Sequence, residues 1–137
     1  MRILLAEDNE VNQRLMFLLL RKRGHAVIVV NNGQEALEAL TEQQFDLVLM
    51  DIQMPVMGGF EATACIRERE RATGEHLPIV AVTANDMRGT RSQYLAAGFD
   101  DYVPKPVQTE ELLQVMARVV SEVKIVTEFA ASTICAG

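Results

Sequence analysis

The stretch DLVLMD at residues 46–51 is a short apolar run that ends on an acid. A continuous apolar run of this length, bounded by polar residues, is typical of a strand that is buried on both faces of a sheet. Similar runs occur at residues 3–6, 26–30 and 79–82, and a weaker one at 102–103. The sequence therefore predicts five strands, each buried on both faces.

The segments between these runs carry apolar residues at helical spacing. In the first segment Val11, Leu15, Leu18 and Leu19 have this spacing, and we expect Leu15, Leu18 and Leu19 to face the sheet. Strands that alternate with helices require a parallel sheet with helices on both faces, and right-handed crossovers leave few topologies. We predict a doubly wound α/β sandwich over residues 1–121, with the end of the last helix and a tail at 122–137.

Composition excludes several functions. The chain has 137 residues, and its 19 acidic against 13 basic residues give a net charge of -6. Such a charge repels phosphate backbones and anionic lipids, so we expect no direct nucleic-acid binding and no membrane contact. No apolar stretch approaches the ~18 residues that span a bilayer. Because Cys65 and Cys135 form no CxxC pair, we expect a reducing, cytoplasmic location.

The residues that close the predicted strands together form one candidate site. They are Glu7 and Asp8 after the first strand, Asp51 after the third, Thr83 after the fourth and Lys105 after the fifth. In a doubly wound sheet, ligands bind beyond the carboxyl ends of the strands. Carboxylates gathered at this edge repel one another unless a cation neutralises them, and all-oxygen ligands favour Mg²⁺. The sequence therefore predicts a magnesium site.

Asp51 is the candidate nucleophile of this site. A carboxylate attacks a phosphoryl group when a metal and cations stabilise the phosphoryl oxygens. Lys105 would contribute a point charge, and the Thr83 hydroxyl would donate a hydrogen bond to another oxygen. Taken singly, each residue also fits an ordinary structural role: Glu7 and Asp8 as acids at a helix start, Asp51 in a turn, Thr83 at a strand end and Lys105 in a solvated loop. Their combination predicts phosphoryl transfer to Asp51.

The chain closely resembles the response regulator receiver domains of two-component signalling. The resemblance runs from about residue 1 to 120 and is carried by four motifs, at residues 6–9, 49–55, 82–84 and 102–106. Residues 9–13 and 54–59 further resemble the receivers of hybrid sensor histidine kinases. The sequence leaves open whether the chain stands alone or was excised from such a kinase.

The resemblance implies a flavodoxin-like (βα)5 fold with strand order 2-1-3-4-5. It implies that a histidine kinase or a histidine phosphotransfer domain phosphorylates Asp51. Glu7, Asp8, Asp51 and the backbone carbonyl of Gln53 would hold Mg²⁺. Thr83 and Tyr102 would form the conformational switch, and the Lys105-Pro106 bond would be cis.

Two other functions use a similar edge. A small Mg²⁺-dependent phosphatase with an aspartyl nucleophile needs an acid-base group two residues beyond the nucleophile, where this chain has Gln53, which cannot exchange protons near neutral pH. A flavin-binding carrier needs a phosphate-cradling loop where Glu7 and Asp8 would repel the phosphate. We therefore expect a signalling phosphoacceptor with slow self-dephosphorylation, not an enzyme. Gln53 and Asn85, which flank the site, are the positions expected to tune the lifetime of the phosphorylated form.

Two helical surfaces carry further predictions. Met16 and Leu20 form a second apolar stripe on the first helix, with Phe17 nearby, and we expect this stripe to be exposed and to dock the phosphohistidine donor. The charged run at residues 67–71 is expected to be a solvated, self-paired helix face.

Overall fold

The computed structural model describes residues 1–84 and 90–121. Its elements are, in order, β1 (Arg2–Ala6), α1 (Glu10–Lys22), β2 (Ala26–Val30), α2 (Gly33–Glu42), β3 (Leu47–Asp51), α3 (Gly59–Thr73), β4 (Ile79–Thr83), α4 (Thr90–Ala96) and β5 (Asp101–Pro104). A further helix, called here the C-terminal helix, occupies residues 109–121. Asn85 and the tail at 122–137 lie outside the described residues, so the domain boundary at 121 stays a prediction.

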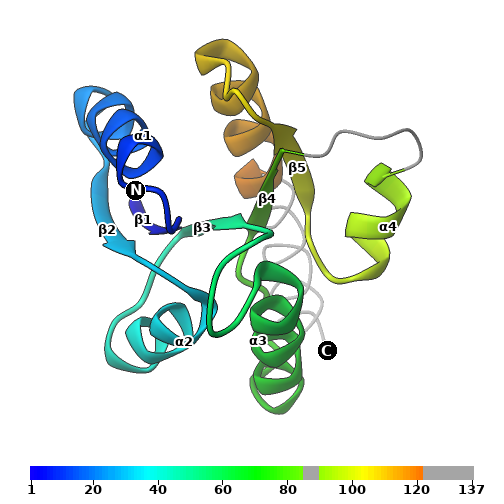
Figure 1. The fold of residues 1–137 in the computed structure, drawn as a ribbon. Coiled ribbons are helices and arrows are strands. Elements are labelled where there is room, and N and C mark those ends of the chain that lie inside the picture. The colour runs from blue at the N-terminus through cyan, green and yellow to red at the C-terminus, as the bar shows by residue number, and fades with distance from the viewer. Residues whose placement is uncertain (85–89, 122–137) are drawn as a thin grey trace, which may run out of the picture.

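The strands form one parallel sheet in the order β2-β1-β3-β4-β5. Helices α1 and the C-terminal helix cover one face, and α2, α3 and α4 cover the other (Figure 1). This confirms the predicted doubly wound sandwich and its strand order. Since all strands are parallel, their carboxyl ends meet at a single edge of the sheet.

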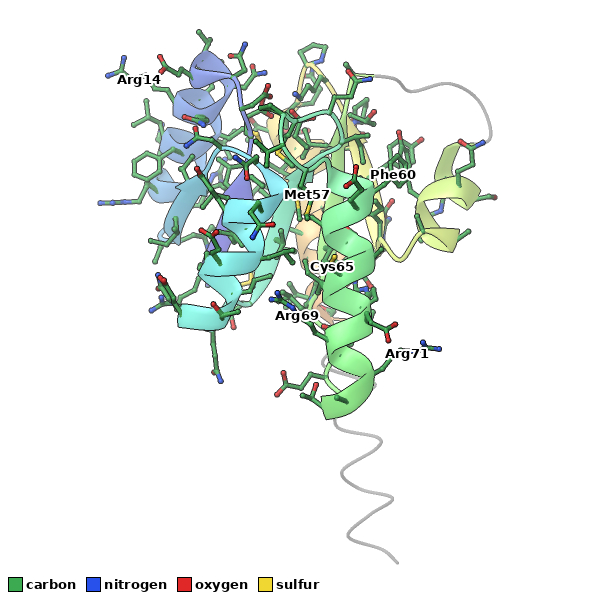
Figure 2. All side chains as sticks on the ribbon, turned by 60° about the horizontal axis from the view of Figure 1, so that its bottom comes forward. Arg14, Met57, Phe60, Cys65, Arg69 and Arg71 are labelled. Carbon is green, nitrogen blue, oxygen red and sulfur yellow. The ribbon has the colours of Figure 1, made fainter. Side chains whose placement is uncertain are left out.

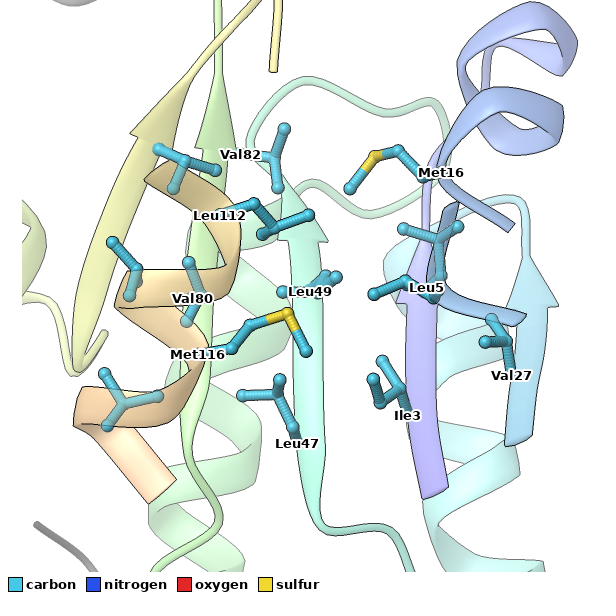
Figure 3. Packing of buried hydrophobic residues seen from close by; sticks show 14 residues of the cluster. Ile3, Leu5, Met16, Val27, Leu47, Leu49, Val80, Val82, Leu112 and Met116 are labelled. Carbon is cyan, nitrogen blue, oxygen red and sulfur yellow. The ribbon is translucent and has the colours of Figure 1, made fainter. Parts of the chain in front are cut away.

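Two apolar layers sandwich the sheet because successive residues of a strand point to opposite faces. In β1, Ile3 and Leu5 pack under α1 and the C-terminal helix, as Figure 3 shows, whereas Leu4 and Ala6 pack on the opposite side. The same alternation orients the strand ends. Asp51 shares the face of Leu47 and Leu49, and Thr83 shares the opposite face with Ile79 and Ala81. Asp51 and Thr83 thus lie at the same edge but on opposite faces.

Strand β2 departs from the prediction that every strand is buried on both faces. Ala26 and Ile28 are exposed, while Val27 and Val30 are buried. The reason is its place at the edge of the sheet, where the helices cover only part of the strand. The apolar run at residues 26–30 resembles a central strand in composition, so the sequence could not distinguish the two positions.

Helix α1 is rotated relative to the prediction. Met16 and Leu20 are buried in the core, whereas Leu15 and Leu18 expose 62% and 56% of their surface. The prediction of an exposed Met16 and Leu20 stripe is therefore wrong. Phe17 is partly buried, with the Arg21 guanidinium 5.6 Å from its ring centroid. Apolar residues surround the whole helix, so periodicity alone could not show which stripe packs on Leu5 and Val27.

The charged run of α3 is only partly solvated. Arg71 and Glu68 form an exposed ion pair, as expected. Arg67 instead turns inward and donates four hydrogen bonds, at 2.6 to 2.9 Å, to the carbonyls of Gly98 and Leu77 and to the carboxylates of Glu70 and Asp100. It therefore joins α3 to the loops that precede β4 and β5, at the end of the sheet opposite the strand carboxyl ends.

Candidate functional site

Three carboxylates meet beyond the carboxyl ends of β1 and β3. Glu7 and Asp51 are buried, with 1% and 3% of their surface exposed, and Asp8 is exposed. One oxygen from each lies within 4.8 Å of the others. The structure thus brings together the three acidic side chains that the sequence predicted as metal ligands.

The position of Glu7 follows from the start of α1. Its backbone N–H donates to the Val30 carbonyl at 3.0 Å, which extends the pairing of β1 with β2. Its Oε1 accepts from the Asn9 backbone N–H at 3.2 Å and from Nδ2 of Asn12 at 3.4 Å. Asn9 also caps α1 by accepting from the Asn12 backbone N–H. The helix cap therefore aims the Glu7 carboxylate at the site.

Lys105 bridges the two buried acids. Its Nζ lies 3.1 Å from Oδ2 of Asp51 and 3.0 Å from Oε2 of Glu7. Its backbone N–H donates to the Thr83 carbonyl at 2.7 Å, and the bond to Pro106 is cis, as expected. A single ammonium faces three carboxylates here, so the described site keeps an excess of negative charge.

This excess changes the protonation of the site. Burial, and after it the nearby Glu7 carboxylate, raise the pKa of Asp51 from 3.8 to about 6, even though the hydrogen bond and charge of Lys105 act to lower it. Burial by itself lowers the pKa of Lys105, but hydrogen bonds to Glu7 and Asp51 outweigh it and raise that pKa overall. Lys105 therefore stays charged, and near neutral pH Asp51 is an anion whose charge is destabilised by burial and by Glu7.

A divalent cation fits this arrangement. Oε2 of Glu7 is buried and, within the described residues, receives no well-directed hydrogen bond although it lies beside Lys105. An unsatisfied buried carboxylate oxygen, among other oxygen ligands with excess negative charge, is the environment that Mg²⁺ prefers. The Gln53 backbone N–H donates to Oδ1 of Asp51 at 3.4 Å. Its carbonyl as a fourth ligand stays a prediction.

The predicted switch residues lie beside a tyrosine that the sequence interpretation missed. Thr83 is buried, and its Oγ1 accepts a hydrogen bond from the Tyr94 hydroxyl at 3.0 Å. The Tyr94 ring packs against Tyr102, with centroids 5.3 Å apart. Tyr94 is the single aromatic of a short and mostly polar helix, and that was the available signal.

Gly59 is a second residue that the sequence interpretation did not single out. A Cβ at this position would clash with the backbone oxygen of Asp51. Only glycine therefore lets the start of α3 approach the end of β3 this closely. The paired glycines at 58–59 were the signal for this close packing.

We expect Asp51→Asn to stabilise the metal-free protein. An acid whose pKa is raised in the folded state binds its proton more tightly there than in the unfolded chain. The parent should therefore lose stability as pH rises from about 4 to about 6, and the Asn variant should not. Above pH 6 the variant should be more stable by about 1–2 kcal/mol in urea unfolding.

Mg²⁺ should reverse that difference, because a ligand of the folded state stabilises the protein that binds it. At a pH of about 7.5, Asp51 is ionised in the parent and stability no longer changes with its titration. Adding Mg²⁺ there should raise the free energy of unfolding of the parent much more than that of the variant. Parallel pH profiles for the two proteins, with and without Mg²⁺, would contradict both the raised pKa and the metal site.

The fold and the site together define a class of protein. It is a doubly wound domain with an acidic pocket, suited to a divalent cation, around one buried aspartate. A model of the response regulator receiver domain matches residues 3–117. The chain belongs to this family.

Its relatives include hybrid histidine kinases. The chain is 44% identical over 120 residues to hybrid signal transduction histidine kinase I of Dictyostelium discoideum. The matched region covers 84% of this chain and 7% of that relative. The chain is 42% identical over 118 residues to the sensor histidine kinase GacS of Pseudomonas protegens, with coverages of 85% and 13%. The chain thus spans only a small part of the length of these relatives.

Solved structures agree with the fold. The receiver domain of the sensor histidine kinase PA1611 from Pseudomonas aeruginosa, solved with a magnesium ion in its active-site cleft, superposes with a TM-score of 0.78 at 39% identity, covering 88% of this chain and 97% of that one. The Saccharomyces cerevisiae receiver domain of Ssk1, solved with the histidine phosphotransfer protein Ypd1, gives 0.77 at 32% identity, with coverages of 90% and 88%. Among the described residues, no helix is both long and apolar enough to cross a bilayer.

Proposed function

We propose that this chain is the phosphoacceptor of a two-component phosphorelay. A phosphohistidine donor transfers its phosphoryl group to a carboxylate oxygen of Asp51, and the phosphorylated domain passes the signal on through a changed surface. The observation that carries the proposal is the buried Asp51 carboxylate, held 3.1 Å from the Lys105 ammonium beside the Glu7 carboxylate. The magnesium-bound PA1611 receiver supports the choice of cation.

The transfer forms a bond between phosphorus and an Asp51 oxygen and breaks the bond between phosphorus and the donor imidazole, which leaves with the bonding electrons. Lys105 would stabilise a phosphoryl oxygen by charge, and Thr83 would donate a hydrogen bond to another. Glu7, Asp8, Asp51 and the Gln53 carbonyl would hold Mg²⁺, which supplies neutralising charge when bound.

The alternative of a small Mg²⁺-dependent phosphatase lacks its acid-base group. Gln53 occupies the position where that group is needed, and its contact with Asp51 runs through its backbone N–H. An amide cannot donate a proton to a leaving alcohol near neutral pH. We therefore propose that the domain holds its phosphoryl group as a signal, with slow hydrolysis, and is not itself an enzyme. Gln53 would tune that rate.

The test is phosphorylation by a small phosphodonor such as acetyl phosphate, followed by mass spectrometry of the intact chain with and without Mg²⁺. We expect one phosphate adduct that requires Mg²⁺, maps to Asp51 and is removed by hydroxylamine, since an acyl phosphate reacts with that nucleophile and a phosphate ester does not. The absence of an adduct with Mg²⁺, or a hydroxylamine-resistant one, would overturn the proposal.

For location and excluded partners, we propose a cytoplasmic domain without nucleic-acid or membrane contact. The net charge of -6 and the free thiol of Cys65 support this assignment.

The donor that we propose is a histidine kinase or a histidine phosphotransfer domain that docks on α1. The Ssk1 receiver, solved with Ypd1, supports this class of partner. The apolar surface is not the predicted one, because Met16 and Leu20 are buried. Val11, Leu15 and Leu18 are exposed instead. A pocket of about 410 Å³ adjoins this surface, lined by Asn12, Leu15, Met16, Leu19, Lys105, Pro106 and Val107. A partner seated there would reach the site at Lys105.

We expect a Leu15→Ser, Leu18→Ser double variant to slow transfer from a phosphohistidine donor by roughly tenfold or more, since exposed leucines that are buried on docking contribute about 1–2 kcal/mol each. Phosphorylation by acetyl phosphate should not change, because that donor needs no docking surface. Ile28→Thr, which alters an exposed apolar residue on β2, is the control. Unchanged transfer in the double variant, or an equal loss with acetyl phosphate, would contradict docking on α1.

A further inference from the structure

Tyr94 packs the described part of helix α4 into the core of the domain. Among residues 91–96, Tyr94 alone is buried, and its neighbours along the helix are exposed. The ring of Tyr94 packs against Phe60 of α3 at 5.8 Å, Phe99 at 5.9 Å and Tyr102 at 5.3 Å between centroids. Figure 2 shows Phe60 at the start of α3, on the side that faces α4. The position of α4 therefore depends on where Tyr94 sits.

The Tyr94 hydroxyl reaches the signalling site from this cluster. It donates a buried hydrogen bond of 3.0 Å to Oγ1 of Thr83. Thr83 closes β4 on the face of the sheet that carries α4, whereas Asp51 closes β3 on the opposite face. The hydrogen bond thus holds the Thr83 hydroxyl on the side away from the Asp51 carboxylate.

A second contact restrains α4 independently of Tyr94. Nη1 of Arg91 lies 2.7 Å from Oδ1 of Asp101, a buried carboxylate at the start of β5. This ion pair does not involve Thr83. If the Tyr94 contact opened, Arg91 would keep the start of α4 near β5, and the helix would pivot about that end.

We propose that Tyr94 is a positioning residue that keeps the receiver in its unphosphorylated conformation by holding the Thr83 hydroxyl on the α4 face. This inference rests on the proposed function of Asp51. When Asp51 carries a phosphoryl group, Thr83 turns its hydroxyl toward a phosphoryl oxygen and leaves Tyr94. Helix α4 then loses its link to the site, and its position reports the state of Asp51.

The test is Tyr94→Phe, which keeps the ring and its packing but removes the hydroxyl. In the absence of any phosphodonor, we expect amide hydrogen exchange in α4 to quicken about fivefold, the effect of losing one buried hydrogen bond. With acetyl phosphate and Mg²⁺, phosphorylation of Asp51 should also quicken, by roughly threefold to fivefold, because Thr83 no longer has to leave Tyr94.

Two comparison variants make the result specific. In a Thr83→Val background, which removes the acceptor, Tyr94→Phe should change neither readout further. Thr63→Val is the matched control, because the buried Thr63 hydroxyl on α3 makes no hydrogen bond within the described part of the chain; it should leave α4 exchange and phosphorylation unchanged.

Hydrogen exchange separates this inference from the proposed function, since it needs no phosphoryl transfer. Suppose that no protein is phosphorylated, but that Tyr94→Phe quickens amide exchange in α4 only when Thr83 is present. The proposed function of Asp51 then fails, and the hold of Tyr94 on α4 stands. If Tyr94→Phe leaves α4 exchange unchanged, or slows phosphorylation, the hold of Tyr94 on the unphosphorylated conformation is overturned.

Discussion

Asp51→Asn should abolish phosphate incorporation from a small phosphodonor, lowering its rate by roughly a thousandfold or more. The amide is neutral and a poor nucleophile, and it no longer presents an anionic oxygen to phosphorus beside Lys105. The side chain keeps its size, and the site should stay packed, since Asp51 is buried at the end of β3. Loss of reaction would therefore reflect lost chemistry. Intact mass measured over time with acetyl phosphate and Mg²⁺ checks it.

The chain offers a matched control just before the start of β3, the strand that Asp51 closes. Asp46 is an exposed acid whose carboxylate accepts from the Arg2 backbone N–H at 2.8 Å. Asp46→Asn makes the same chemical change away from the site, and it should leave phosphorylation intact. A phosphate adduct on the Asp51→Asn protein, at a rate near that of the parent, would show that another residue is the acceptor.

Arg67→Ala should cost about 3–5 kcal/mol of the free energy of unfolding. The guanidinium is largely buried and pairs with Glu70 and Asp100, whose carboxylates are also mostly covered. Removing it takes the guanidinium partner from both acids, which keep hydrogen bonds to the Leu77 and Ile79 backbone N–H groups, and takes a donor from the carbonyls of Leu77 and Gly98. Losing one partner of a buried pair costs more than the pair contributes, because the remaining charge is uncompensated.

Urea unfolding of Arg67→Ala beside Arg71→Ala measures this effect within one helix. The Arg71 and Glu68 side chains of the second pair are 79% and 73% exposed, so that variant should change stability by no more than about 0.5 kcal/mol. Arg67→Lys should recover only part of the loss, since an ammonium cannot reach the same set of acceptors. Equal effects of the Arg67→Ala and Arg71→Ala variants would contradict an anchoring role for Arg67.

Much of the site could be predicted because the fold simplifies the problem. Once apolar runs show that the strands are parallel, their carboxyl ends must share an edge, and the residues that close them become neighbours. Glu7, Asp51 and Lys105 were placed together on that reasoning, and the structure joins them through the Lys105 ammonium. The cis bond at Pro106 came from the family resemblance, and the structure has it.

The features that the sequence interpretation got wrong or missed have a common cause. The rotation of α1, the inward turn of Arg67 and the hydrogen bond of Tyr94 depend on which side of a helix meets its neighbour. A helix with Leu15, Met16, Leu18 and Leu20 has apolar residues on several sides, so more than one rotation satisfies the pattern. An arginine in a charged run reads as solvated until the loops that it contacts are in place.

The alternation of strands and helices, the edge at which Asp51 lies and the chemistry available there could all be predicted from the chain alone. These properties follow from local periodicity and from the identity of the residues that end each strand, both of which are written along the chain. Tertiary packing was needed to establish which leucines of α1 are exposed, that Arg67 contacts two loops and that Tyr94 donates a hydrogen bond to Thr83. Those depend on contacts between segments distant in sequence, whose free energies are settled by packing and burial.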